Sequence, residues 1–313
     1  MTTLIQLEYI VAVDTYRHFA KAAEKCFVTQ PTLSMQIKKL EENLEVVLFD
    51  RTKQPVIPTD AGKKIIEQAR VVLRENKRIF DVVKESKEET SGELRIGVIP
   101  TIAPYLLPLF YGNYKRSHPE VKLKVEELVT EKIVEHLNND LLDVGILVTP
   151  LNDSSIVETP LYYEEMMVYT NINHHLATKV IIKIGDIATP EIWLLNDGHC
   201  FRHQIVNLCE LQTMESDSLP FEYEGGSLDT LMKIIDKEGG YTLIPELAGY
   251  DLPEGKKKQI KHFSNYIPLR EVSLVTTRQF AKSKLISLLS YCIKNSVPNE
   301  LLIKTRGSVV KWK

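Results

Sequence analysis

The short segment GHCFRHQIVNLCEL brings thiols and cations together. It holds two of the chain's four cysteines and two of its eight histidines. The thiolate is the reactive form of cysteine, and nearby positive charge favours it. Cys200 has His199, Arg202 and His203 beside it, and a helix expected to begin near Phe201 would add the positive end of its dipole. We therefore expect Cys200 to be a nucleophilic cysteine.

Cys209, the second thiol of the segment, is expected to be less acidic and less accessible. Phe201, Ile205 and Leu208 form an apolar stripe at helical spacing, and Cys209 lies near that buried side.

A zinc site is an alternative interpretation of the same segment. Its ligands would be His199, Cys200, His203 and Cys209. The spacing H-C-x2-H-x5-C matches no usual structural zinc site, so we expect neither a metal nor a cofactor.

The composition indicates a folded globular protein with room for two domains. The chain has 313 residues, of which 43% are hydrophobic and 26% charged. No apolar run reaches the roughly 18 residues of a membrane span, and the N-terminus lacks a signal-peptide layout, so we expect the cytoplasm. The net charge is −3, so any charge that binds nucleic acid must be local.

The first 90 residues are expected to be mainly helical. Apolar periodicity and capping residues predict helices over 4–13, 19–25 and from Thr29 to about residue 44, then a β-wing over 48–59 and a long helix over 60–89. This long helix carries more apolar residues than a solvated linker needs. A partner helix is expected to cover them.

The rest of the chain alternates between strand and helix patterns, which predicts a parallel sheet and an α/β domain. Strands are expected over 94–99, 121–126, 143–148, 166–170, 192–196, 241–245 and 272–276. We divide the chain into a winged helix-turn-helix domain (1–60), a linker helix (61–90), a regulatory domain (91–302) and a basic tail (303–313). The regulatory domain should have two Rossmann-like lobes arranged as in periplasmic binding proteins, about 91–165 with 267–302 and 166–266.

The polar start of the third helix suits DNA recognition. Gln30, Pro31, Thr32, Ser34 and Gln36 would face base edges in the major groove. The cations Lys38, Lys39, Arg51 and Lys53 would contact phosphates. Phe19 to Thr52 resembles the winged helix-turn-helix of LysR-type transcriptional regulators, through the Ala22-Ala23 pair, the stretch TQPTLS and the stretch LFDR. The resemblance implies a DNA-binding regulator that is not an enzyme.

Two further stretches, GHCFRHQ and IPTIAPYLLP, resemble the OxyR branch of that family, which senses hydrogen peroxide. The resemblance implies that Cys200 is the peroxidatic cysteine and that Cys209 resolves it by forming a disulfide. It also implies a peroxide pocket made of Thr101, Thr130, His199, Arg202 and His203. Glu126 and His203 depart from the family pattern and would alter local charge and proton supply.

The spacing of the two cysteines has a mechanical consequence. Nine helical residues rise about 13.5 Å and turn about 900°, whereas a disulfide needs α-carbons within roughly 7 Å. A bond between Cys200 and Cys209 therefore requires the helix to unwind, and this unwinding could act as a switch.

The resemblance also implies partners: promoter DNA, a homotetramer built as a dimer of dimers, RNA polymerase and cellular disulfide reductants. The alternative is a LysR-type regulator that binds a metabolite in its cleft, with structural cysteines.

Overall fold

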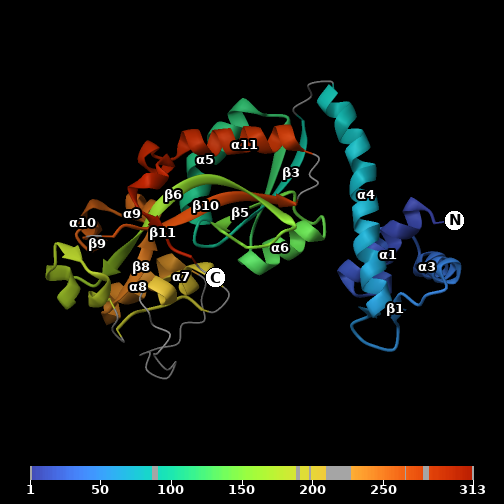
Figure 1. Cartoon of the computed structure of the whole chain (residues 1–313), viewed down its shortest axis with the longest axis horizontal. Coiled ribbons are helices and arrows are strands. Elements are labelled where there is room, and N and C mark those ends of the chain that lie inside the picture. The colour runs from blue at the N-terminus through green and yellow to red at the C-terminus, as the bar shows by residue number, and fades with distance from the viewer. Residues whose placement is uncertain are drawn as a thin grey trace. The chain divides into compact units, whose positions relative to one another are not determined.

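The computed structural model describes residues 2–86, 91–187, 191–196, 199–208, 227–264, 266–277 and 282–311, without the side chains of 77–78 and 80–86. The chain divides into two compact units. One comprises residues 1–89 with 279–281, and the other comprises residues 90–278 with 282–313. The fold class expected from the sequence, a helix-turn-helix unit followed by an α/β unit, is confirmed (Figure 1).

The N-terminal unit is a three-helix core with a small wing. Its elements are α1 (Leu4–Tyr16), α2 (Phe19–Lys25), α3 (Gln30–Leu44), the antiparallel strands β1 (Phe49–Asp50) and β2 (Ile57–Pro58), and α4 (Asp60–Ser86). The Thr29 side chain caps α3 by accepting from the Thr32 backbone N–H, as the sequence predicted. Leu33, Ile37 and Leu40 of α3 are fully buried. Because these three residues face the core, the opposite face of α3 is exposed to solvent.

The first half of α4 belongs to this core, so its apolar residues there are covered within the unit rather than by the partner helix expected from the sequence. Ile66 and Ala69 are each 2% exposed and pack with the residues of α1 and α3. Arg70 is also buried, and its guanidinium forms a 2.8 Å ion pair with Asp14 of α1. Further along, Ile79 is 63% exposed. This unit therefore covers only part of the apolar face of α4.

The C-terminal unit is built on one curved nine-stranded sheet. Its strands are β3 (Gly92–Val98), β4 (Val121–Glu127), β5 (Val144–Thr149), β6 (Ile156–Thr170), β7 (Ile181–Ile182), β8 (Tyr241–Pro245), β9 (Ile260–Phe263), β10 (Pro268–Thr277) and β11 (Ser308–Val309). Its helices are α5 (Ala103–Ser117), α6 (Thr130–Asn138), α7 (Cys200–Leu208), α8 (Leu228–Glu238), α9 (Glu246–Asp251), α10 (Glu254–Lys257) and α11 (Ser283–Ser296), with short 3-10 turns at 175–178, 184–186, 299–302 and 304–306.

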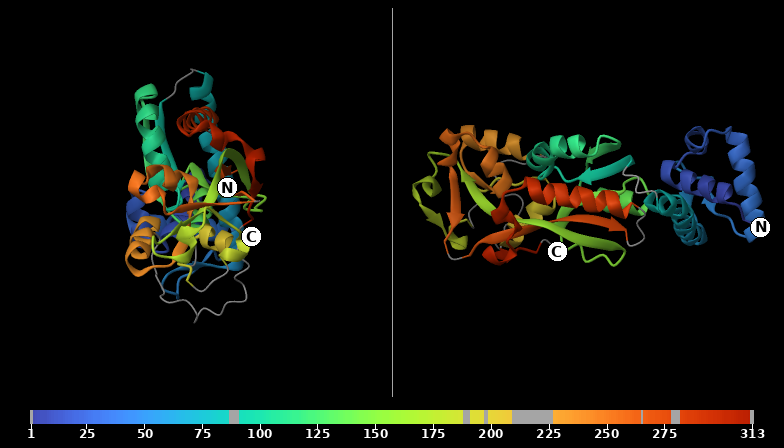
Figure 2. Two further views of the ribbon diagram at one scale, coloured as in Figure 1. Left: turned by 90° about the vertical axis from the view of Figure 1, so that its left-hand side faces the viewer. Right: turned by 90° about the horizontal axis from the view of Figure 1, so that it is seen from above.

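Two long strands connect two lobes of this unit. The strand order is β4-β3-β5-β10-β6-β9-β7, with β8 also on β6 and β11 on β10. β6 pairs with β10 over its first part and with β8 and β9 over its last part, so β6 runs from one lobe into the other (Figure 2). The sheet is mixed, because β10 is antiparallel to both β5 and β6. The parallel sheet expected from strand-helix alternation is confirmed for β3, β4 and β5, and it does not extend to the antiparallel pairs that β10 makes.

The strand predicted over 192–196 was also wrong. Ile192 forms only an isolated parallel bridge with Tyr241. The carbonyl of Trp193 accepts the Thr242 hydroxyl at 2.7 Å, which replaces the next ladder bond. The apolar residues there are buried without forming a strand.

The basic segment after residue 302 is part of the fold. β11 pairs in parallel with β10, and Val310 is 7% exposed. The Gln204 side chain of α7 donates to the Val310 carbonyl at 2.9 Å, and the Asn207 side chain donates to the Lys311 carbonyl at 3.2 Å. Val310 and Lys311 therefore lie against α7.

Candidate functional site

Cys200 is the first residue of α7 and lies inside the C-terminal unit. It is 3% exposed. Phe201, Ile205 and Leu208 on the next turns are buried in the main hydrophobic core and hold α7 in place. The predicted apolar stripe is confirmed. Cys209, the predicted resolving thiol, lies outside the described residues.

The cation that acts on Cys200 is Arg270 of β10, which the sequence analysis missed. Arg270 is 1% exposed, and its guanidinium carbon lies 5.0 Å from the centre of the Phe201 ring. Its Nη1 donates to the Thr101 hydroxyl at 3.2 Å, and its Nη2 donates to the Thr101 carbonyl at 2.9 Å. Thr101 precedes α5, so Arg270 connects the loop after β3 with the start of α7.

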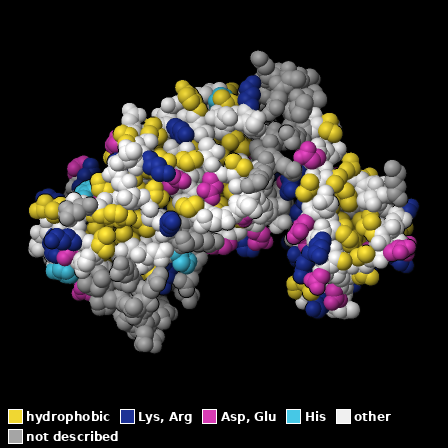
Figure 3. All heavy atoms as spheres, in the orientation of Figure 1, with side chains coloured by type: hydrophobic (Ala, Val, Ile, Leu, Met, Phe, Trp, Pro, Cys, Tyr) yellow, Lys and Arg dark blue, Asp and Glu magenta, His cyan; other side chains and the backbone are white. Residues whose placement is uncertain are grey.

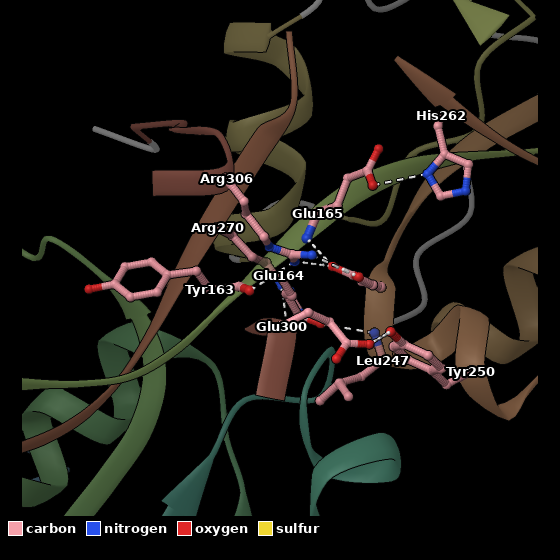
Figure 4. A network of polar contacts seen from close by, with 10 residues as sticks. Tyr163, Glu164, Glu165, Leu247, Tyr250, His262, Arg270, Glu300 and Arg306 are labelled. Carbon is pink, nitrogen blue, oxygen red and sulfur yellow. Dashed lines mark hydrogen bonds and ion pairs between the residues drawn. The ribbon is translucent and has the colours of Figure 1, made fainter. Parts of the chain in front are cut away.

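A buried carboxylate neutralises this guanidinium. Arg270 and Glu164 are register partners across β10 and β6, and Nε of Arg270 donates to Glu164 at 2.7 Å. The second Glu164 oxygen accepts from the Leu247 backbone N–H at 3.1 Å. Burial raises the pKa of Glu164, and the Arg270 charge opposes this effect. Figure 4 shows this pair within a network that reaches Arg306 near the end of the chain.

Burial dominates the acidity of the Cys200 thiol. Desolvation raises its pKa above the ordinary value, against the lowering effects of Arg270, the Thr130 hydroxyl and the Phe201 backbone N–H. Glu131, the second residue of α6, raises the pKa further. The resting site therefore favours a protonated thiol at neutral pH, which differs from the thiolate expected from the sequence.

The groups that most affect the acidity of the Cys200 thiol do not include the three cations next to it in sequence. Burial lowers the pKa of His199, which favours its neutral form. The Arg202 guanidinium donates to the Leu195 carbonyl at 3.0 Å, and His203 Nδ1 lies 3.3 Å from the His199 carbonyl. In a helix, residues adjacent in sequence point in different directions, so neighbours in the chain need not surround the thiol.

The two predicted threonines, Thr101 and Thr130, both come to this site. They are 1% and 3% exposed, and Thr101 touches Arg270. The Thr130 hydroxyl lies close enough to hydrogen-bond the Cys200 sulfur and so favours its thiolate. Apart from Cys200, no described residue hydrogen-bonds this hydroxyl. Glu126, by contrast, is exposed on β4. A buried hydroxyl with free hydrogen-bonding capacity beside a thiol can hold a small polar reactant.

The exposed face of α3 forms a second candidate site. Gln30, Pro31, Thr32 and Lys38 are exposed, as expected for groups that contact DNA. Met35, which the sequence analysis missed, is 61% exposed on the same helix. Its apolar side chain can contact a thymine methyl group.

Other predicted DNA contacts are partly engaged within the unit. The Gln6 side chain donates to the Gln36 side chain at 3.3 Å, and Ser34 is half-buried. Arg51 forms a 2.8 Å ion pair with Glu41 and must leave it to reach a phosphate, whereas Lys53 is exposed.

Family models match both units. The model "LysR substrate binding domain" matches residues 87–296, and "Bacterial regulatory helix-turn-helix protein, lysR family" matches residues 4–63.

The chain belongs to the LysR family of transcriptional regulators.

Within the LysR family, relatives of the OxyR type resemble the chain over most of its length. The "Hydrogen peroxide-inducible genes activator" of Haemophilus influenzae is 35% identical, over 86% of this chain and 88% of that protein. A full-length OxyR variant from Pseudomonas aeruginosa, with aspartate in place of a cysteine, has 30% identity and a TM-score of 0.78, covering 95% of this chain and 99% of that chain. A hydrogen-peroxide-bound cysteine-to-serine variant of Corynebacterium glutamicum OxyR has 25% identity and a TM-score of 0.62, covering 100% and 98%.

The C-terminal unit also has three neighbouring side chains of the types that bind metal ions. Among the described residues, His174, His175 and Glu191 bring ligand atoms within 4.8 Å of one another. However, His174 Nδ1 accepts the Leu176 backbone N–H, so its Nε2 carries the proton that faces Glu191 at 3.2 Å. A metal bound to Nε2 would displace this proton. Nδ1 would then carry the proton and could no longer accept from the Leu176 backbone N–H.

No described helix of this LysR-type chain is both long and apolar enough to cross a membrane.

Proposed function

We propose that the chain is a hydrogen-peroxide-responsive regulator of transcription in which Cys200 is the sensing residue. The observation that carries the proposal is the buried Cys200 thiol at the start of α7, with Arg270 and the buried Thr130 hydroxyl around it. The named relatives support the identity of the signal, because they are described as peroxide-inducible activators or as peroxide-bound OxyR.

The first step is a two-electron oxidation of Cys200. The Cys200 thiol loses its proton, the thiolate attacks one peroxide oxygen, and the O–O bond breaks. The other oxygen leaves as hydroxide and takes up the proton to become water. Cys200 becomes a sulfenic acid. The Thr130 hydroxyl can donate to or accept from the bound peroxide, and Arg270 stabilises the negative charge in the transition state.

The second step is disulfide formation. The Cys209 thiol loses its proton and its sulfur attacks the Cys200 sulfur. The S–O bond breaks, and the oxygen leaves as hydroxide and takes that proton to become water. α7 spans Cys200 to Leu208, so the α-carbons of these residues lie about 12 Å apart. Cys209 is one peptide bond further, and one bond shifts an α-carbon by only about 3.8 Å. With α7 intact, the two α-carbons cannot come within the roughly 7 Å that a disulfide needs. The helix must unwind.

The unwinding of α7 is the proposed signal to the DNA-binding unit. Dimers would form through the apolar part of α4 and pair into a tetramer, and the disulfide would reposition subunits on promoter DNA. RNA polymerase would read this change, and cellular disulfide reductants would reset it. The protein would act in the cytoplasm, where thiols are kept reduced.

Stoichiometric peroxide followed by mass spectrometry of the thiols tests this proposal. We expect a bond between Cys200 and Cys209, and a DNase footprint that changes with it. Cys200→Ser should abolish both responses, and Cys209→Ser should stop at the sulfenic acid. Identical footprints for the oxidised and reduced proteins would refute the proposed switch.

A metabolite sensor is the second candidate. An open cavity of about 470 Å³ lies between α5, α9 and the end of α11, lined by residues that include Pro104, Leu109 and Tyr250. It is mostly apolar and contains none of the residues of the cysteine site. Cys200→Ser discriminates, because a metabolite sensor keeps its response in that variant and a peroxide sensor loses it.

A further inference from the structure

Glu164 stands out among the buried charged groups because it lies behind the cation of the sensing site. The two side chains of the Glu164–Arg270 pair are 0% and 1% exposed. Their 2.7 Å contact joins β6 to β10 at directly opposed positions. The neighbouring Glu165 points to the other face of β6, where it contacts His262 at 2.9 Å (Figure 4). The two adjacent carboxylates therefore have different surroundings.

The contact with Glu164 also orients the guanidinium. Its Nε is taken by Glu164, both Nη groups donate to Thr101, and its flat face lies over Phe201. The hydrogen-bonding edges of Arg270 are thus aimed at Glu164 and Thr101. Arg270 acts on Cys200 through its field rather than through one of these bonds.

The carboxylate reduces this field. Two opposite charges in contact form a dipole, whose potential falls off faster with distance than that of a lone cation, and the dry interior amplifies the difference. The other charged groups that face the site do not make up for the reduced positive potential at Cys200. Glu131 of α6 disfavours the thiolate, His199 is buried in a neutral-favouring setting, and Glu246 of α9 faces Glu164 with a like charge.

We propose that Glu164 is a positioning residue that limits how strongly Arg270 promotes ionisation of Cys200, and so sets the sensitivity of the sensor to peroxide. The role assigned to Cys200 rests on the proposed function. The limit on its ionisation does not, because it follows from the arrangement of Glu164, Arg270 and the thiol. Removing the charge of Glu164 should make the sensing thiol more reactive, although it breaks a buried contact.

The test titrates Cys200 in the full-length protein. The thiolate absorbance of each variant is measured against pH and corrected with the same variant carrying Cys200→Ser. Glu164→Gln should raise the thiolate fraction at neutral pH roughly tenfold, a ratio that corresponds to one pH unit. The rate of sulfenic acid formation with peroxide should rise by a similar factor. Glu165→Gln is the matched control, because it removes the adjacent carboxylate, and it should leave the titration unchanged.

A double substitution checks the route of the effect. Glu164→Gln combined with Arg270→Gln should abolish the gain, because the carboxylate acts through the guanidinium. If Glu164→Gln does not fold, Glu164→Asp keeps the charge but withdraws it from Nε, and a smaller increase in the same direction is expected.

An unchanged or smaller thiolate fraction in the folded Glu164 variant overturns the inference. So does an equal increase in Glu165→Gln. The titration does not involve peroxide, so an acidified thiol that fails to react with peroxide would refute the proposed function and leave the role of Glu164 standing.

Discussion

The rate at which peroxide oxidises Cys200 is expected to depend on the Thr130 hydroxyl. This hydroxyl is buried beside Cys200, and apart from Cys200 no described residue hydrogen-bonds it. Thr130→Val keeps the shape of the side chain and removes only that hydroxyl. We expect peroxide oxidation of Cys200 to slow roughly tenfold, about the effect of one net hydrogen bond. Trapping of the sulfenic acid against time measures this rate.

The thermal stability of Thr130→Val shows whether the hydroxyl acts on the reaction with peroxide or is needed for the fold. Because the Cys200 thiol is a weak hydrogen-bonding group and no other described residue hydrogen-bonds the Thr130 hydroxyl, Thr130→Val should leave the melting temperature of the reduced protein unchanged or slightly raised. A slower reaction together with a clear loss of stability would point to misfolding of the site instead.

At this scale the sequence identified part of the site. The motif around Cys200 and the two threonines were recognisable, and these residues do converge. Arg270 was missed because it lies 70 residues beyond Cys200 and reaches the site through the pairing of β10 with β6. Its signal was present as an arginine within the apolar stretch PLREVSLV, where an unpaired charge would be costly. Glu164 within LYYEEMMV is the matching signal on the partner strand.

At the scale of elements, the backbone carbonyls of Val310 and Lys311 hold α7. The fully buried Gln204 donates to the Val310 carbonyl, so unwinding α7 must break this bond. Gln204→Ala should speed disulfide formation after sulfenic acid formation about fivefold, the equivalent of roughly 1 kcal/mol. Quenched samples analysed by mass spectrometry give this rate. Asn207→Ala removes an exposed bond to Lys311 and should have a smaller effect. Slower closure in Gln204→Ala would contradict the idea that α7 must unwind.

The contact between β9 and β6 is expected to depend on pH. The Glu165 hydrogen bond raises the pKa of His262, so protonated His262 stabilises the fold. This contribution is complete below the ordinary histidine pKa of about 6.5 and is lost as the pH rises through the higher folded value. His262→Gln should therefore lower the melting temperature at about pH 5.5 and have little effect at about pH 8.5. Glu165→Gln should reproduce this pattern, and equal losses at both values would rule out the ion pair as the cause.

Elements with strong local signals were predictable, and elements defined by distant partners were not. Thr29 and Pro31 marked the start of α3 correctly. The segment 192–196 has the apolar composition of a strand, but pairing with β8 ends after a single bridge. β11 was missed because its two residues carry no periodicity, and only its partner β10 makes it a strand.

At the scale of the whole molecule, the two units have different surfaces for different partners. The face shown in Figure 3 mixes basic, acidic and hydrophobic side chains over the C-terminal unit, without a continuous basic area. The exposed polar and basic side chains of α3 and the wing are instead local to the N-terminal unit. This agrees with the net charge of −3, because DNA contacts need only a local positive surface.

The exposed part of α4 is the expected assembly surface. Ile66 and Ala69 hold the start of the helix in its own core, while Ile79 is 63% exposed. Ile79→Asp should separate dimers, because a carboxylate cannot be buried unpaired between two helices. It should weaken binding to a two-half-site promoter roughly hundredfold through lost avidity, and it should spare the fold. Sedimentation velocity and DNA titration measure these effects. Gln68→Asp adds the same charge at another exposed position of α4, and an equal loss in that variant would show that charge alone, rather than the apolar surface at Ile79, accounts for the effect.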